Sequence, residues 1–203
     1  MDGEITMAYE ELKPSGITTA TPNNIMLGAG TIHKGLQLSG GKWNFDESVI
    51  GATSGGGKVD IVPETMDVAV DGALVAVKGL RFKTGEKATI EVSFVEMTPD
   101  LLKMVTIGDV TEASSTFTGY SEITSKSQIE EGDYIENFAY VGRKTDGTPI
   151  IIIFDQCICT SGLSVEGKNK EAGTFKGVFE CVAEIGTDVS KLPWHIIYPK
   201  ANG

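Results

Sequence analysis

A glycine-rich segment followed by a lysine is the first feature of this sequence that suggests chemistry. Residues 51–58 read Gly-Ala-Thr-Ser-Gly-Gly-Gly-Lys, a composition shared with loops whose backbone amides cradle phosphate groups. The spacing does not fit, because such a loop needs a glycine, four residues, and then Gly-Lys followed by Ser or Thr. Ala52 occupies the first glycine position here, and Val59 follows Lys58. The segment is interpreted as a flexible glycine loop that binds no nucleotide.

Thiols and imidazoles are the next candidates for chemistry. Cys157 and Cys159 are two residues apart, so they share one face of a strand, and Cys181 lies on a later strand. A structural zinc site needs four ligands, and His33 and His195 fall outside any ligand spacing. The cysteines are therefore predicted to be buried free thiols, with no metal and no cofactor. An odd number of cysteines also favours a reducing compartment.

Catalytic groups are equally hard to assemble from this sequence. A serine or cysteine nucleophile needs a neighbouring base, and neither histidine accompanies a Gly-x-Ser-x-Gly turn. Acidic residues are frequent, but Glu130, Glu131 and Asp133 together are more typical of a solvated face than of an acid–base pair. We expect no enzymatic activity.

The elements that would position these residues are mostly strands. Residues 87–94 alternate apolar and polar side chains, as a half-buried strand does. Asp71-Gly72 and Gly85-Glu86 are interpreted as turns between strands. One helix is predicted over about 98–107, because Thr98 suits the N-cap, Pro99 suits the first turn, and Gly108 follows. The fold class is mainly β: an antiparallel β-sandwich or barrel with one short flanking α-helix and extended arms or loops.

Length and composition set the remaining limits. The chain has 203 residues, 25 glycines and a formal net charge of −11. The longest apolar run, residues 150–154, is too short to cross a membrane, and the acidic N-terminus does not resemble a secretory signal. We predict an N-terminal arm over residues 1–22, a β-rich domain over 23–185 with a long loop at about 46–66, and a C-terminal tail over 186–203.

Several segments in order resemble the tail tube proteins (major tail proteins) of long-tailed bacteriophages and prophages. The resemblance covers about residues 23–108, and the segments that carry it are 23–30, 51–57, 62–72, 77–80 and 96–102. It implies a β-sandwich or barrel with one helix. It also implies a structural virion protein: six subunits close into a ring, and rings stack into a hollow tube that conducts genomic DNA during ejection.

The same resemblance implies the partners and the place of assembly. They are further copies of the chain, the tape-measure protein, the tail-tip or baseplate proteins and the terminator protein, all in the virion after assembly in the host cytoplasm. Arms and a long loop would bridge subunits, here residues 1–22, 46–66 and 186–203. The candidate inter-subunit residues are Gly51, Thr53, Ser54, Gly55, Gly56, Gly57 and Lys58.

The acidic charge has a role in such a tube. DNA carries about one negative charge per 1.7 Å of axis, so an acidic lumen would let the duplex pass without holding it. Glu91 and Glu136, at alternate positions of strands, are the candidate lumen-facing acids. The alternative function is a carbohydrate-binding or adhesion module on a phage or cell surface. A cluster of exposed aromatic side chains would favour that alternative.

Overall fold

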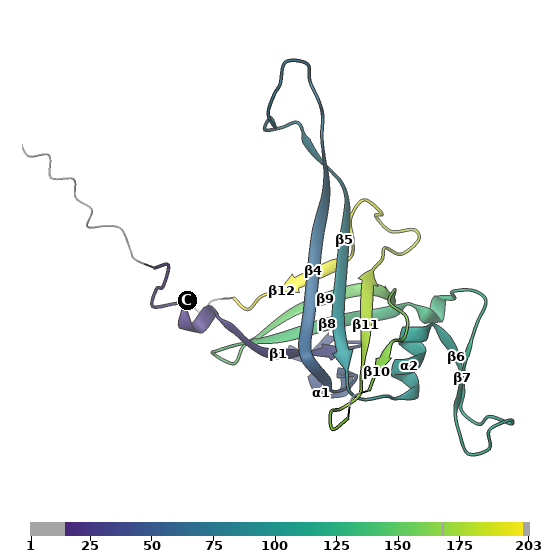
Figure 1. The fold of residues 1–203 in the computed structure, drawn as a ribbon. Coiled ribbons are helices and arrows are strands. Elements are labelled where there is room, and N and C mark those ends of the chain that lie inside the picture. The colour runs from purple at the N-terminus through teal and green to yellow at the C-terminus, as the bar shows by residue number, and fades with distance from the viewer. Residues whose placement is uncertain (1–14, 168, 201–203) are drawn as a thin grey trace, which may run out of the picture.

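A single curled antiparallel sheet forms the body of the protein in the computed structural model, which describes residues 15–167 and 169–200 (Figure 1). The strands are β1 (Met26–His33), β2 (Leu38–Ser39), β3 (Lys42–Trp43), β4 (Thr53–Asp67), β5 (Arg81–Phe94), β6 (Gly108–Thr111), β7 (Glu122–Ser125), β8 (Ile135–Lys144), β9 (Pro149–Cys159), β10 (Val165–Glu166), β11 (Thr174–Cys181) and β12 (Trp194–Ile197). The helices are α1 (Phe45–Ser48) and α2 (Pro99–Thr106), with 3-10 turns η1 (Pro22–Asn24) and η2 (Glu131–Asp133). The predicted mainly β class is confirmed.

The main sheet curls until its two edge strands meet. Its order is β1-β8-β9-β11-β5-β4, with β10 added to β11 and β12 added to β9. The first and last strands of this path, β1 and β4, contact each other. Tyr140 of β8 fills the seam between them: a Cβ on Gly30 would lie 2.5 Å from its ring, and one on Gly57 would lie 3.0 Å from it. Glycine in both strands therefore allows the sheet to close like a barrel.

Two apolar clusters cover opposite faces of β8 and β9. The larger cluster lies inside the curl and contains stacked phenylalanines, with Phe138 and Phe179 centroids 4.3 Å apart. The smaller cluster packs Leu36 against Ile151 and Ile153 on the outer face. The all-apolar run at residues 150–154 predicts a strand covered on both sides, and the structure confirms this.

Helix α2 forms where local sequence signals predict it. The Thr98 hydroxyl accepts a hydrogen bond from the Leu101 amide at 3.2 Å, and Pro99 begins the helix. Leu101 and Val105 are almost fully buried against the main core. The helix ends one residue earlier than the glycine suggested, because Ile107 adopts the left-handed conformation with φ of 53°. Gly108 instead begins β6, where a Cβ would lie 2.9 Å from the Thr124 carbonyl oxygen.

The predicted loop at 46–66 is wrong for most of its length. Residues 53–67 form β4, which pairs with β5 in a hairpin that rises far above the body (Figure 1). Pro63 lies inside β4 and is tolerated because β4 has a hydrogen-bonded partner on one side only. The Gly85-Glu86 turn is also wrong, since β5 runs straight through it with a register shift opposite Glu64.

The C-terminal tail, predicted to bridge subunits, joins the sheet of its own chain. Trp194–Ile197 pairs with β9 from Phe154 to Ile151 as strand β12. The Trp194 indole donates to Glu86 at 3.1 Å, which ties this strand to β5. Of the predicted N-terminal arm, residues 1–14 lie outside the described residues. Residues 15–22 are exposed or half-buried and contain no strand.

Candidate assembly surface

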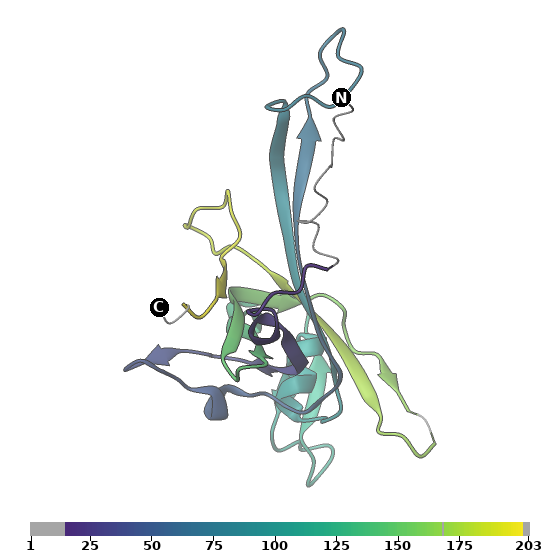
Figure 2. The same ribbon diagram turned by 90° about the vertical axis from the view of Figure 1, so that its left-hand side faces the viewer.

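The outer half of the β4–β5 hairpin carries a large group of exposed apolar side chains. Leu74 is 97% exposed and Val75 is 77% exposed, and both belong to the segment 68–80 that joins β4 to β5. This segment forms the tip of the hairpin, far from the body (Figure 2). Other large apolar side chains on this hairpin are also exposed: Val62, Met66, Val68, Val70, Val77 and Phe82. Single exposed apolar residues are common on proteins, but a group of this size on one projecting element is typical of an interaction surface.

Local interactions give the hairpin its shape without help from the core. The Ala73 amide donates to the Val70 carbonyl at 3.0 Å, which confirms the predicted turn at Asp71-Gly72. The Val68 amide donates to the Leu80 carbonyl at 2.9 Å and closes the base of the tip. Below it, the Arg81 guanidinium donates two hydrogen bonds of 2.8 Å to the Asp67 carboxylate. Hydrogen bonding to Arg81 lowers the pKa of Asp67, so this pair stays charged at neutral pH.

The predicted inter-subunit residues lie at the root of this hairpin and not at its tip. A Cβ on Gly51 would lie 3.1 Å from Leu101 of α2, and one on Gly56 would lie 3.6 Å from Ala29 of β1. Gly55 and Gly56 both have φ of 80°, a left-handed backbone conformation that favours glycine. Close packing at Gly51 and backbone conformation at Gly55 and Gly56 therefore explain the glycines, and their place in β4 corrects the interpretation as a flexible loop. The residues concerned are Gly51, before β4, and Thr53, Ser54, Gly55, Gly56, Gly57 and Lys58, within β4.

The two predicted lumen-facing acids are not brought together. Glu91 of β5 and Glu136 of β8 are separated by β11 and β9 in the sheet order. Glu91 forms an ion pair of 2.7 Å with Lys176 on β11, and Lys58 lies opposite it on β4. A carboxylate flanked by two ammonium groups repels DNA weakly. Glu136 is exposed on its strand.

Negative charge is concentrated instead around α2, β6, β7 and η2. Residues 96–136 contain nine acidic and two basic side chains, a net charge of −7 out of the chain's −11. We call this segment the acidic unit. Lys126 organises its inner edge, with its Nζ 2.7 Å from the Asp133 carboxylate and 3.2 Å from that of Glu130. Burial favours a higher pKa for Asp133, but hydrogen bonds from Lys126 and the Glu130 amide outweigh it, so the pKa lies below its usual value.

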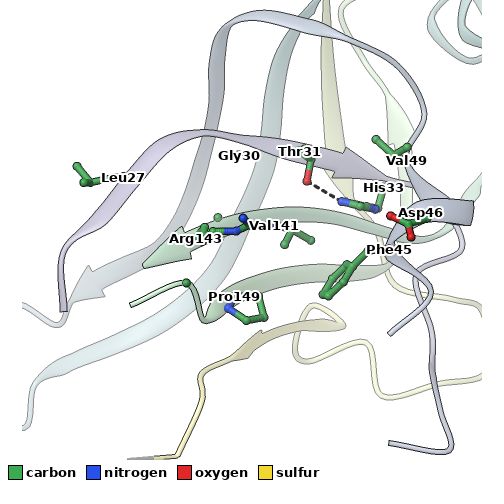
Figure 3. Close-up of a pocket in the computed structure, with 12 residues that line it drawn as sticks. Leu27, Gly30, Thr31, His33, Phe45, Asp46, Val49, Val141, Arg143 and Pro149 are labelled. Atoms are coloured by element: carbon green, nitrogen blue, oxygen red, sulfur yellow. Dashed lines mark hydrogen bonds between the residues drawn. The ribbon is translucent and has the colours of Figure 1, made fainter. Parts of the chain in front are cut away.

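One cavity of about 600 Å³ lies beside β1, β8 and α1 (Figure 3). His33 borders it, but both ring nitrogens are occupied, one by the Thr31 hydroxyl at 2.7 Å and the other by the Ser48 hydroxyl at 2.8 Å. Burial lowers the pKa of His33, so the ring is neutral at neutral pH. Ser48 is 3% exposed and also contacts the Phe45 carbonyl, so its oxygen is not presented to a ligand. The pair is explained as a link between β1 and α1.

Other chemical groups in the described residues are packed or dispersed. Cys157, Cys159 and Cys181 are buried and free, and the ranges 15–167 and 169–200 contain no group of three residues placed to hold a metal ion. In those same ranges no helix is both long and apolar enough to span a membrane. Two aromatic side chains that the sequence analysis did not single out, Phe117 and Tyr120, are exposed in the loop between β6 and β7.

Comparison with known proteins does not add to this geometry. No protein-family model matches the chain, and no curated protein matches it. The resemblance over residues 23–108 therefore stays a prediction from the sequence.

Proposed function

We propose that this chain is a structural subunit of a phage tail tube. Six copies form a ring, rings stack into a hollow tube, and genomic DNA passes through it during ejection. The proposal has no enzymatic step and no cofactor. It places the protein in the virion, with the tape-measure, tail-tip or baseplate and terminator proteins as further partners. It rests on the sequence resemblance and on one structural observation, the projecting apolar hairpin.

The hairpin supports self-assembly because its apolar side chains have nowhere to pack within the subunit. Full burial of one such side chain contributes about 1.5–3 kcal/mol, so Leu74 and Val75 alone would contribute several kcal/mol to an interface. The hairpin projects far enough from the body to reach a neighbouring subunit (Figure 1). Because the edge strands β1 and β4 meet within the subunit, the projecting hairpin is the element left to join copies of the chain into a repeating assembly.

The charge distribution supports the same proposal. The hairpin segment 53–94 contains five basic and six acidic residues, so it is nearly neutral and docking it costs little electrostatic repulsion. The acidic unit carries most of the negative charge and needs a solvated environment. In a tube, that environment is either the outer surface or the lumen. Of these, the lumen would let the charge act on DNA.

The deciding experiment is electron microscopy of the purified protein and of one matched pair of variants. Leu74→Asp with Val75→Asp places two charges on the hairpin tip and should abolish tubes and rings, while the monomer keeps its circular dichroism spectrum. Thr116→Asp with Thr118→Asp places the same charges on the loop between β6 and β7 and should leave assembly intact. Normal tubes from the hairpin variant, or no tubes from the wild type at any concentration tested, would refute the proposal.

The alternative of a carbohydrate-binding or adhesion module has one observation in its favour. Phe117 and Tyr120 are 55% and 72% exposed, three residues apart, in a loop rich in Ser and Thr. Aromatic rings presented in this way can stack on sugar rings. A wild-type protein that stays monomeric and binds glycans, with binding lost in Phe117→Ala and Tyr120→Ala, would replace the tube proposal by this one.

A further inference from the structure

The two halves of the main sheet are joined by a short junction that contains two facing cysteines. Strand β11 pairs with β5 over six residues but with β9 over only three, the pairs Phe179↔Cys159, Glu180↔Ile158 and Cys181↔Cys157. Beyond this point β12 takes the place of β11 beside β9. The hairpin-bearing half, β4-β5-β11, is therefore linked to β9 through few backbone contacts, and a pair of thiols lies at one end of them.

The hydrogen-bond pattern around Cys157 and Cys181 shows which kind of antiparallel pair they form. The Val182 amide donates to the Gln156 carbonyl at 3.1 Å, and the Thr160 amide donates to the Val178 carbonyl at 2.8 Å. In antiparallel strands such hydrogen-bonded pairs alternate with non-hydrogen-bonded ones, whose Cα atoms lie about 4.5 Å apart. Cys157 and Cys181 fall on a non-hydrogen-bonded pair. That spacing lies within the range of about 4.4–6.8 Å found in disulfides.

The third cysteine has no equivalent partner. Cys159 faces Phe179 across the junction, and its diagonal separation from Cys181 is about 7–8 Å for residues so placed. Cys157 and Cys159 lie two residues apart on one strand, with side chains that run parallel and do not converge. All three thiols are at least 97% buried, so the choice of partner depends on register and not on exposure.

We propose that Cys157 and Cys181 form a disulfide that locks the hairpin-bearing half of the sheet to the β9 half when the chain folds under oxidising conditions. One thiolate attacks an oxidant disulfide such as oxidised glutathione, which gives a mixed disulfide and one glutathione thiol. The second thiolate displaces the other glutathione, so both cysteines lose their protons and two electrons pass to the oxidant. This proposal does not depend on the tube.

Burial determines when the reaction takes place. Burial is the main factor that raises the pKa of Cys157, and it raises that of Cys181 to about 12. The folded protein therefore holds both as unreactive thiols and is expected to resist oxidant. Oxidation should need the unfolded or partly open chain. A reducing compartment would keep the bond open, and folding or opening outside it would close the bond.

The test is refolding of the full chain in a glutathione redox buffer, followed by thiol counting and peptide mapping. Thiols that alkylate in denaturant should fall from three to one, and trypsin should release peptide 145–168 joined to peptide 177–191. Because Cys157 and Cys159 share the first peptide, fragmentation of the joined pair by tandem mass spectrometry assigns the bond to Cys157. Cys159→Ala is the matched control and should still form the link. Cys157→Ala and Cys181→Ala should not form any intramolecular link.

If a variant does not fold, the wild-type protein by itself still tests the proposal. Three free thiols after refolding in excess oxidised glutathione would overturn it. So would a link that joins Cys159 to either of the other cysteines. In the expected case, the oxidised protein also unfolds at a higher temperature than the reduced protein, and dithiothreitol abolishes the difference only after unfolding.

Discussion

The β4–β5 hairpin projects from the body, whereas the acidic unit packs its helix α2 against the body, and the two are stabilised in opposite ways. The hairpin segment 53–94 is nearly neutral, and its outer half is held by strand pairing and an exposed Arg81–Asp67 ion pair. The acidic unit, residues 96–136, has a net charge of −7 and is anchored by Lys126 and the almost buried Asp133. Covering the hairpin therefore costs little desolvation free energy, whereas covering the acidic unit costs much.

This difference indicates which surface a partner would cover. Desolvating apolar side chains is favourable, whereas desolvating carboxylates without compensating cations is costly. The hairpin is thus suited to an interface and the acidic unit to solvent or to the passage of a polyanion. A subunit that is stabilised by its body leaves the hairpin free to serve assembly.

The largest effect should come from truncating the same residue type in the body and on the hairpin. Phe179 is fully buried against Phe138 and Phe94, so Phe179→Ala should lower the free energy of unfolding by about 3–5 kcal/mol. Phe82 is 52% exposed on β5, so Phe82→Ala should change it by less than about 0.5 kcal/mol. Urea denaturation followed by circular dichroism measures both. Equal losses would show that the hairpin packs like the core.

An intermediate effect is expected at the anchor of the acidic unit. The Asp133 carboxylate accepts a hydrogen bond from the Glu130 amide at 2.8 Å, as well as its contact with Lys126. Asp133→Ala should therefore cost about 1–2 kcal/mol, whereas Ala at the exposed neighbour Glu131 should cost less than about 0.5 kcal/mol.

The pKa of Asp133 is lower in the folded than in the unfolded protein. The stability that the ionised Asp133 contributes is therefore complete at pH values above its unfolded pKa, and it is lost as pH falls through the folded pKa. The difference in unfolding free energy between wild type and Asp133→Ala should shrink below about pH 4. A difference that stays constant to low pH would indicate that packing, and not the charge of Asp133, anchors the acidic unit.

The smallest effect is expected at the exposed ion pair of the hairpin. Arg81→Gln removes the paired hydrogen bonds to Asp67, so amide hydrogen exchange at Val68 and Leu80 should accelerate while global stability stays unchanged. Lys58→Gln removes the comparable exposed ion pair with Asp60 near the root and should leave exchange at the tip unaltered. If both variants altered exchange at the tip equally, the hairpin would behave as one rigid element down to its root.

Features that depend on neighbours in sequence could be predicted. Helix α2 was expected because Thr98 and Pro99 act within one turn, and the turn at Asp71-Gly72 needs only four residues. The alternation in residues 87–94 identified the inward face of β5, where Ala88, Ile90, Val92 and Phe94 are all buried. Gly85 was misinterpreted as a turn because a glycine in a bulge and a glycine in a turn look the same in sequence.

The candidate surface could be predicted only in part. The sequence predicted that a loop near residues 46–66 would contact neighbouring subunits, and it placed the contacting residues in the glycine-rich segment 51–58. The exposed tip around Leu74 and Val75 was instead expected to be one strand of a short hairpin. Apolar residues in a strand pattern usually pack on a core, and only the length of β4 and β5 shows that this part extends beyond it.

The sequence by itself determined the β-rich class, the flanking helix and the excess of acid, because these follow from propensity, capping and composition. The tertiary structure decided what the glycines do, where the tail docks, which cysteines face each other and which apolar side chains are left uncovered. The physical reason is that each of these depends on contact across the chain, such as Gly57 with Tyr140 or Cys157 with Cys181. Such contacts form only when the sheet curls, so no local sequence pattern predicts them.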